Sequence, residues 1–280
     1  MSRRDCEREK QLAQSNLAIS FDFRSGRGDA GASSADQQPI SSRGLFRILY
    51  NGNKHSRIPG REAREEGEDI IASLANDVDF QRVWDGFGQT YNFYKTVFNR
   101  NSIDDQGIDI VVSVRFDNDD RPPGYDDAMW TSDLKQMIFG DGDGKVSTSF
   151  TSAIDVIAHE LTHGVTDLTA NLPYHRQSGA LNEPLSDWAA GETVDEADWL
   201  IGEGLFVDAV ETPALRSMTN PETAFKDVFG RGDDQPSHMD QYEDAPDTKR
   251  GDHGGVHFNS GISNRAFYLA AKELGGESKS

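Results

Sequence analysis

The sequence predicts an α+β protein of two lobes, in which one helix joins a β-rich N-terminal lobe to a mainly helical C-terminal lobe. Two patterns carry this prediction. Strand-like alternation and a single helix occupy the first half, whereas apolar residues at helical spacing dominate the second. We expect residues 44–150 to form the first lobe and residues 151–280 the second. Residues 1–43 are polar and have little to bury, so we expect a disordered segment or the remnant of a pro-segment.

The spacing of aromatic and apolar residues predicts the helix and the strands of the first lobe. Aromatic residues recur at helical spacing from Phe80 to Phe98, which predicts a helix with a buried aromatic stripe. Apolar and polar residues alternate from Ile108 to Phe116, which predicts a strand, and QMIF at 136–139 predicts a shorter strand. The stretch GDGDG at 140–144 lacks the ligand spacing and closing glutamate of an EF-hand, so we interpret it as a turn.

The second lobe contains three predicted helices. An apolar stripe that runs from Ile154 to Leu168 predicts a helix over residues 151–169, which is the helix between the lobes. A second helix is expected over residues 179–190, and a third in the last part of residues 254–274.

Charge and composition exclude several classes of function. The chain of 280 residues carries a formal net charge of -20, which repels nucleic acids and anionic membranes. It has no apolar run near the roughly 18 residues that a membrane helix needs, so we expect no membrane insertion. Cys6 is the only cysteine, which excludes an intrachain disulfide and a cysteine zinc cluster. The charged N-terminus lacks the apolar segment of a conventional signal peptide, so we expect a cytoplasmic protein or one exported by a non-standard route, and the sequence leaves both open.

The motif His159-Glu160-x-x-His163 lies on the helix between the lobes. Positions i and i+4 share one helical face, so both imidazoles can reach one metal ion, whereas Glu160 projects about 100° away and can act on bound water. A catalytic zinc ion normally takes a third protein ligand, for which Glu183 on the next predicted helix is the candidate. Asp187, four residues later, could accept the second N–H of a ligand histidine. The alternative is a chance motif beside two exposed carboxylates.

Several long motifs in order resemble the thermolysin family of zinc metallopeptidases. They are HELTHGVTDLTANLPYHRQSGALNEPLSD, PALRSMTNPETAF and GDHGGVHFNSGISNRAFYLAA, and RILYNG and FYKTVFNRNSIDDQGI resemble its protealysin-type branch. The resemblance implies a two-lobed zincin fold and zinc held by His159, His163 and Glu183. It also implies Glu160 as general base, and these further roles: Tyr174 and His257 as oxyanion donors, Asp252 as the carboxylate that orients His257, and Arg216 as the ligand of a substrate carbonyl.

The same resemblance implies a monomeric neutral endopeptidase that cleaves peptides or proteins on the amino side of hydrophobic residues. Asp127 and Ala128 would hold the substrate backbone along an edge strand. An apolar pocket would be lined by Phe150, Val156, Ile201, Leu205 and Leu215.

The chain departs from the family pattern at four places. Asp127 replaces the usual asparagine and cannot donate back to the substrate. Pro184 follows the proposed ligand Glu183. Beyond the first turn of a helix it removes a hydrogen bond, which costs about 3 kcal/mol, and it could also shift Glu183. Calcium is doubtful, because only three positions of the family's double site are matched, Asp155, Asp198 and Glu203. The chain also ends at Ser280, where family members continue, so we expect a truncated second lobe and keep an inactive zinc- or peptide-binding homologue as the alternative function.

Overall fold

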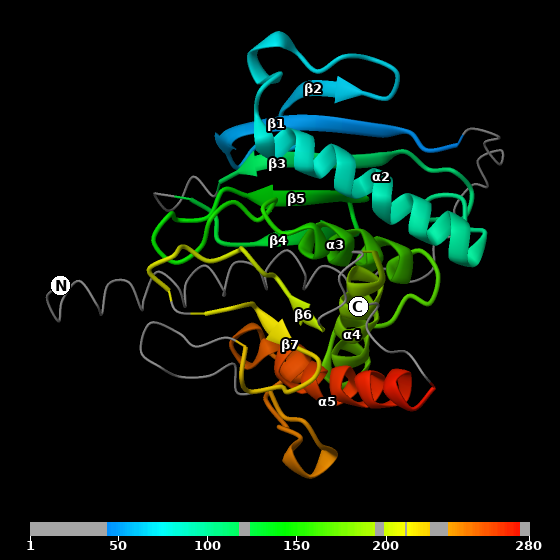
Figure 1. The fold of residues 1–280 in the computed structure, drawn as a ribbon, viewed down its shortest axis with the longest axis vertical. Helices are drawn as coiled ribbons and strands as arrows, with labels where there is room; N and C mark the ends of the chain where they lie inside the picture. Colours follow the sequence, from blue (N-terminus) through cyan, green and yellow to red (C-terminus); the bar gives the residue numbers. More distant parts are fainter. Residues whose placement is uncertain (1–43, 118–123, 194–198, 211, 225–234, 275–280) are drawn as a thin grey trace, which may run out of the picture.

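The N-terminal lobe is built on a five-stranded mixed sheet. The computed structural model describes residues 44–117, 124–193, 199–210, 212–224 and 235–274. The strands follow the spatial order β2-β1-β3-β5-β4 (Figure 1). Their bounds are Arg47–His55 for β1, Arg61–Glu65 for β2, Ile110–Phe116 for β3, Ala128–Thr131 for β4 and Gln136–Gly140 for β5. The three central strands are parallel to one another, and β2 and β4 pair antiparallel at the two edges.

Helix α2, Val78–Phe98, packs its aromatic stripe on the sheet. Asp77 caps its N-terminus by accepting the backbone N–H of Asp79, and Asn99 ends it in the left-handed conformation. Phe80 and Phe87 are fully buried in the main core. The helix predicted from the aromatic spacing is therefore confirmed.

Helix α3, Ile154–Asp167, lies between the sheet and the C-terminal helices, next to edge strand β4 (Figure 1). Trp130 of β4 donates its indole N–H to Asp167 at 3.0 Å, and its ring packs against Gly164. On the opposite side, the hydroxyl of Tyr94 in α2 donates to Thr162 at 2.9 Å. Because α3 is fixed from both sides, the residues it carries are held in register with the edge of the sheet.

The C-terminal lobe consists mainly of helices α4, Arg176–Thr193, and α5, Asp252–Glu273, with the short hairpin of β6, Leu200–Ile201, and β7, Arg216–Ser217. Among the described residues, short 3-10 helices lie at 239–241 and 249–251 in this lobe and at 72–74 in the N-terminal lobe. The N-terminal part of α5 is kinked, because residues 253–255 adopt positive φ. The two larger helices pack closely against each other and against α3.

The structure confirms the two-lobed α+β fold and corrects its details. The predicted strands correspond to β3 and β5, and the predicted helices to α2, α3 and α4. Strands β1, β2, β6 and β7 were not predicted, whereas β4 lies at the edge strand that the family resemblance implied at Asp127 and Ala128. Helix α5 begins with a kinked turn, in which residues 253–255 are not in helical conformation, before its regular part. Pro184 lies inside α4 without interrupting it, and Glu183 still has a ligand atom within 4.8 Å of those of His159 and His163, so the shift that Pro184 could have caused is not seen. Residues 1–43 lie outside the described part of the chain. No helix among the described residues is both long and apolar enough to span a membrane.

Two glycines of α4 test how tightly the helices pack. A Cβ at Gly179 would lie 2.4 Å from Cγ1 of Val256 in α5, whereas a Cβ at Gly191 would meet nothing within 4 Å. We therefore expect Gly179→Ala to lower the free energy of unfolding by about 1–3 kcal/mol. Gly191→Ala should leave it unchanged or raise it by up to about 1 kcal/mol, because alanine favours the helix. Urea denaturation of both variants measures this, and equal effects would contradict the described contact between α4 and α5.

Candidate metal centre

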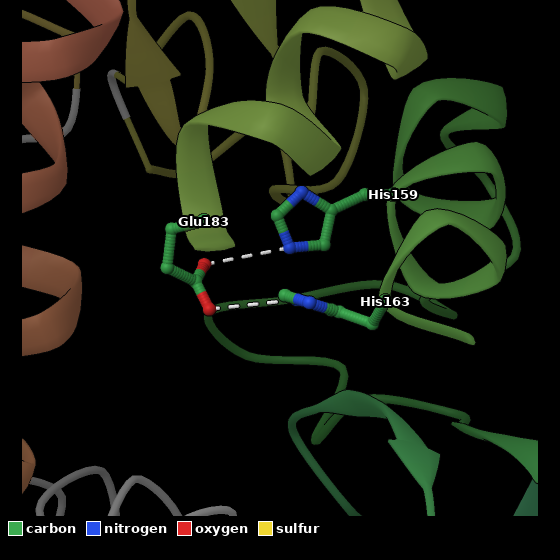
Figure 2. A group of neighbouring side chains, drawn as sticks. All are labelled: His159, His163 and Glu183. Carbon is green, nitrogen blue, oxygen red and sulfur yellow. Dashed lines mark ion pairs between the residues drawn. The ribbon is translucent and has the colours of Figure 1, made fainter. Parts of the chain in front are cut away.

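Helices α3 and α4 bring three potential metal ligands together in the interior. His159 and His163 lie one turn apart on α3, with ring centroids 4.5 Å apart, and both face Glu183 of α4 (Figure 2). Nε2 of His159 lies 3.4 Å from Oε2 of Glu183, and Nε2 of His163 lies 3.4 Å from its Oε1. All three side chains are buried. The structure therefore brings the three predicted ligands together from two consecutive helices.

The second nitrogen of each histidine faces a partner on α4. Nδ1 of His159 lies 2.8 Å from Oδ1 of Asp187, as the sequence predicted. Nδ1 of His163 lies 2.9 Å from Oδ1 of Asn182 and 3.2 Å from the hydroxyl of Ser186. Acceptors at Nδ1 hold a proton on that nitrogen, so that Nε2, on the side of Glu183, is the nitrogen that would bind a metal ion.

Sequence reasoning missed Asn182 and Ser186. Their positions could have indicated them, because Asn182 precedes the ligand Glu183 and Ser186 lies one turn further along the same helix.

The donor set fits zinc. Two imidazole nitrogens and one carboxylate oxygen lie within 4.8 Å of one another. Two histidines and a glutamate are the protein ligands of one common type of catalytic zinc site, which leaves a position for water. Among the described residues, this is the one group of three or more such side chains that could hold a metal ion.

The charges of the cluster depend on one another. Burial by itself raises the pKa of Glu183, but the nearby histidines and Arg216 outweigh it and hold the pKa well below its usual range. Burial lowers the pKa of His159, yet the carboxylates of Asp187 and Glu183 raise it to about 9. Arg216 and His159 likewise keep the pKa of Asp187 below its usual value despite complete burial. Both carboxylates of α4 are thus charged and ready to stabilise cations.

Glu160 is buried beside the ligands without belonging to them. Its Oε2 accepts the backbone N–H of Trp130 in β4 at 2.8 Å. The side chain therefore points to the edge of the sheet, as the helical angle between Glu160 and the histidines predicts.

Tyr174 and His257 approach the cluster from the other side. The Tyr174 hydroxyl lies 2.9 Å from Nε2 of His257 and also donates to Oε1 of Glu183. Nδ1 of His257 lies 2.6 Å from Oδ1 of Asp252, whose Oδ2 accepts the backbone N–H of His257 at 2.6 Å. The kink of α5 brings Asp252 next to His257, so the contact between Asp252 and His257 that the resemblance implied is present.

Arg216 is held by carboxylates of α4. Its Nη1 donates to Oδ1 of Asp187 at 2.9 Å, and its Nη2 lies 3.1 Å from Oε2 of Glu183. The sequence indicated only a contact with substrate, which stays a prediction. The salt bridges to Asp187 and Glu183 were not predicted.

For the predicted substrate-binding residues other than Arg216, the structure shows where each residue lies but not a contact with substrate. Asp127 directly precedes edge strand β4, which begins at Ala128. Four residues of the predicted pocket, Phe150, Val156, Leu205 and Leu215, belong to or pack against the main core, whereas Ile201 packs with Ala158 and Ala190.

The three positions that match the family's calcium site form no metal-binding group among the described residues. Asp155 uses its two carboxylate oxygens to accept the backbone N–H groups of Val156 at 2.7 Å and Gly202 at 2.6 Å. Burial raises the pKa of Asp155 to about 6. Glu203 belongs to no metal-binding group among the described residues, and Asp198 lies outside them.

The fold and the site define the class of protein. A helix with two histidines one turn apart, a glutamate from the next helix that faces them and a separate buried glutamate form the arrangement typical of metallopeptidases of the zincin type. The model of the thermolysin metallopeptidase catalytic domain matches residues 75–167, and that of the alpha-helical domain matches residues 170–280. The chain belongs to the thermolysin family of metallopeptidases.

Individual relatives agree with this assignment. The chain is 44% identical over 240 residues to an extracellular metalloprotease of Pectobacterium carotovorum subsp. carotovorum, covering 83% of this chain and 65% of the relative. It is 42% identical over 240 residues to protease PrtS of Photorhabdus sp., covering 83% and 61%. The structure of the precursor of protealysin from Serratia proteamaculans aligns with a TM-score of 0.75 and 38% identity, covering 91% of this chain and 79% of that one. The chain thus spans less than two thirds of the length of the first two relatives.

The assignment of Glu183 as a ligand can be tested without substrate. Glu183→Gln keeps the shape of the side chain but removes its charge. We expect zinc affinity to fall by more than the ~10–100-fold that loss of an outer hydrogen-bond partner costs. Glu192→Gln, an exposed position of the same helix, is the matched control and should bind zinc like the parent. Competition with a chromophoric chelator measures the affinities, and equal affinity of both variants would refute the assignment.

Proposed function

We propose that the protein is a zinc-dependent neutral endopeptidase that hydrolyses peptide bonds on the amino side of hydrophobic residues. Family membership and the three-ligand cluster support zinc metallopeptidase chemistry. One observation carries the proposal furthest: Glu160 is buried next to His159, outside the ligand set, and its Oε2 accepts a hydrogen bond from edge strand β4. This contact supports the proposal that Glu160 acts as the base, between the candidate metal centre and the strand proposed to bind the peptide.

Bound zinc would act as a Lewis acid, which lowers the pKa of water and polarises a carbonyl group. Glu160 would take the proton of the attacking water and then pass it to the leaving amine. The hydrogen bond from the backbone N–H of Trp130 to Oε2 orients the carboxylate of Glu160 for this transfer.

Tyr174 and His257 would donate to the oxyanion of the tetrahedral intermediate. They approach the cluster together, and the oxygen of Tyr174 lies 2.9 Å from Nε2 of His257. Since Asp252 accepts the Nδ1–H, donation from Nε2 requires the imidazolium form, whose charge the Asp252 carboxylate balances. Preorganised donors of this kind are each worth about 3–4 kcal/mol in acyl transfer.

The substrate backbone would pair with β4, which is the last strand in the order of the described sheet. Extended peptides commonly add to such an edge through main-chain hydrogen bonds. Asp127, just before β4, could accept a substrate N–H but not donate in return. The preference for hydrophobic residues would come from Phe150, Val156, Ile201, Leu205 and Leu215, and Arg216 would reach a substrate carbonyl beside them.

Replacing the proposed base separates chemistry from metal binding. We expect Glu160→Gln to lower kcat for a peptide substrate by about 10²–10⁴-fold, because general base catalysis is lost. Zinc content should stay at one ion per chain. Undiminished hydrolysis would sink the mechanism. Absence of chelator-sensitive hydrolysis in the parent, with zinc still bound, would favour the non-catalytic homologue.

The oxyanion role predicts a second kinetic signature. His257→Ala should lower kcat by about 10²–10³-fold while KM changes little, since the donor acts on charge that develops during the reaction. Steady-state kinetics on the zinc-loaded variant measures both constants. A rise in KM at constant kcat would instead assign His257 to ground-state binding.

A further inference from the structure

Asn264 of α5 contacts Asp187, the carboxylate that faces the candidate ligand His159. The HExxH motif predicts neither this residue nor its position. The side chain is completely buried, and its Nδ2 donates to Oδ2 of Asp187 at 2.7 Å. Because a carboxylate only accepts hydrogen bonds, the amide must present its nitrogen here. In the described part of the chain, the Oδ1 of Asn264 is buried without a hydrogen-bond partner.

The orphaned oxygen argues against a purely space-filling role. A buried polar atom without a partner is costly, and an apolar residue of similar size would avoid that cost. Asn264 therefore contributes through its one satisfied group, the Nδ2–H that faces Asp187.

Asp187 connects several elements of the site. Its Oδ1 lies 2.8 Å from Nδ1 of His159 in α3 and 2.9 Å from Nη1 of Arg216 in β7. Its Oδ2 lies 3.1 Å from the same Nη1 and 2.7 Å from Asn264. Arg216 contacts both oxygens, so it does not by itself decide which oxygen faces His159. The donor on Oδ2 from α5 fixes the plane of the carboxylate.

We propose that Asn264 is a positioning residue of the metal centre, which holds Asp187 so that its Oδ1 accepts the Nδ1–H of His159. His159 then keeps the tautomer whose Nε2 lone pair faces the candidate zinc position. This inference rests on the zinc site of the proposed function and adds a residue from α5, about 100 residues after the HExxH motif.

The test compares two buried asparagines of one helix. Asn264→Leu removes the donor, whereas Asn259→Leu makes the same change at a buried asparagine that bonds the backbone of Glu243 instead. Zinc affinity of each folded variant is measured by competition with a chromophoric chelator at constant pH. We expect a loss of about 10–100-fold for Asn264→Leu, the range for outer partners of metal ligands, and less than about threefold for Asn259→Leu.

A double-mutant cycle with Asp187→Asn shows whether Asn264 acts through Asp187. If it does, Asn264→Leu should weaken zinc binding no further once Asp187 is replaced. If the leucine variant does not fold, Asn264→Ala takes its place with the same expectation. Parental zinc affinity in the Asn264 variant, an equal loss in Asn259→Leu, or additive losses in the cycle would each overturn the proposal. None of these measurements uses a substrate, so failure of the peptidase proposal would appear separately, as an inactive zinc-loaded parent.

Discussion

The arrangement of the C-terminal lobe depends on two fully buried carboxylates of α4, Glu183 and Asp187. A buried charge is strongly unfavourable unless it is paired and hydrogen-bonded. The partners come from three other elements: the histidines of α3, Arg216 of β7, and His257 of α5. Each of these elements must therefore pack where its side chain reaches the carboxylates of α4. The contacts that pack the helices of the lobe are therefore the same contacts that assemble the candidate metal centre.

The sheet contributes to the site through its edge strand. Trp130 in β4 makes two contacts with α3, one from its backbone N–H to Glu160 and one from its indole N–H to Asp167. The proposed base is thus positioned relative to the strand proposed to hold the substrate. A shift of α3 along β4 would separate the two, and the close packing of Gly164 on Trp130 and the hydrogen bond from Tyr94 to Thr162 oppose such a shift.

Patterns within one segment of the sequence predicted the features that depend on that segment alone, such as single helices and the residues on one helical face. The aromatic spacing predicted α2, and the i, i+4 histidines predicted the shared face of α3. Glu183 and Asp187 were found because both lie on one predicted helix. In contrast, Asn182, Ser186 and Asn264 are single polar residues whose partners lie on other helices. The kinked turn that precedes the regular part of α5 has positive φ at Gly254 and Gly255, and helical periodicity contains no information about such a turn. The short strands β6 and β7 have too few residues for a detectable alternation.

The central claim is that α3 and α4 together form one zinc site from two histidines and a glutamate. Anomalous diffraction at the zinc absorption edge, from crystals of the full chain grown with zinc, tests it most directly. The account predicts one strong peak bound by Nε2 of His159, Nε2 of His163 and a carboxylate oxygen of Glu183, with Nδ1 of His159 still facing Asp187. A peak that lies elsewhere, or one bound by the histidines with Glu183 turned away, would contradict it.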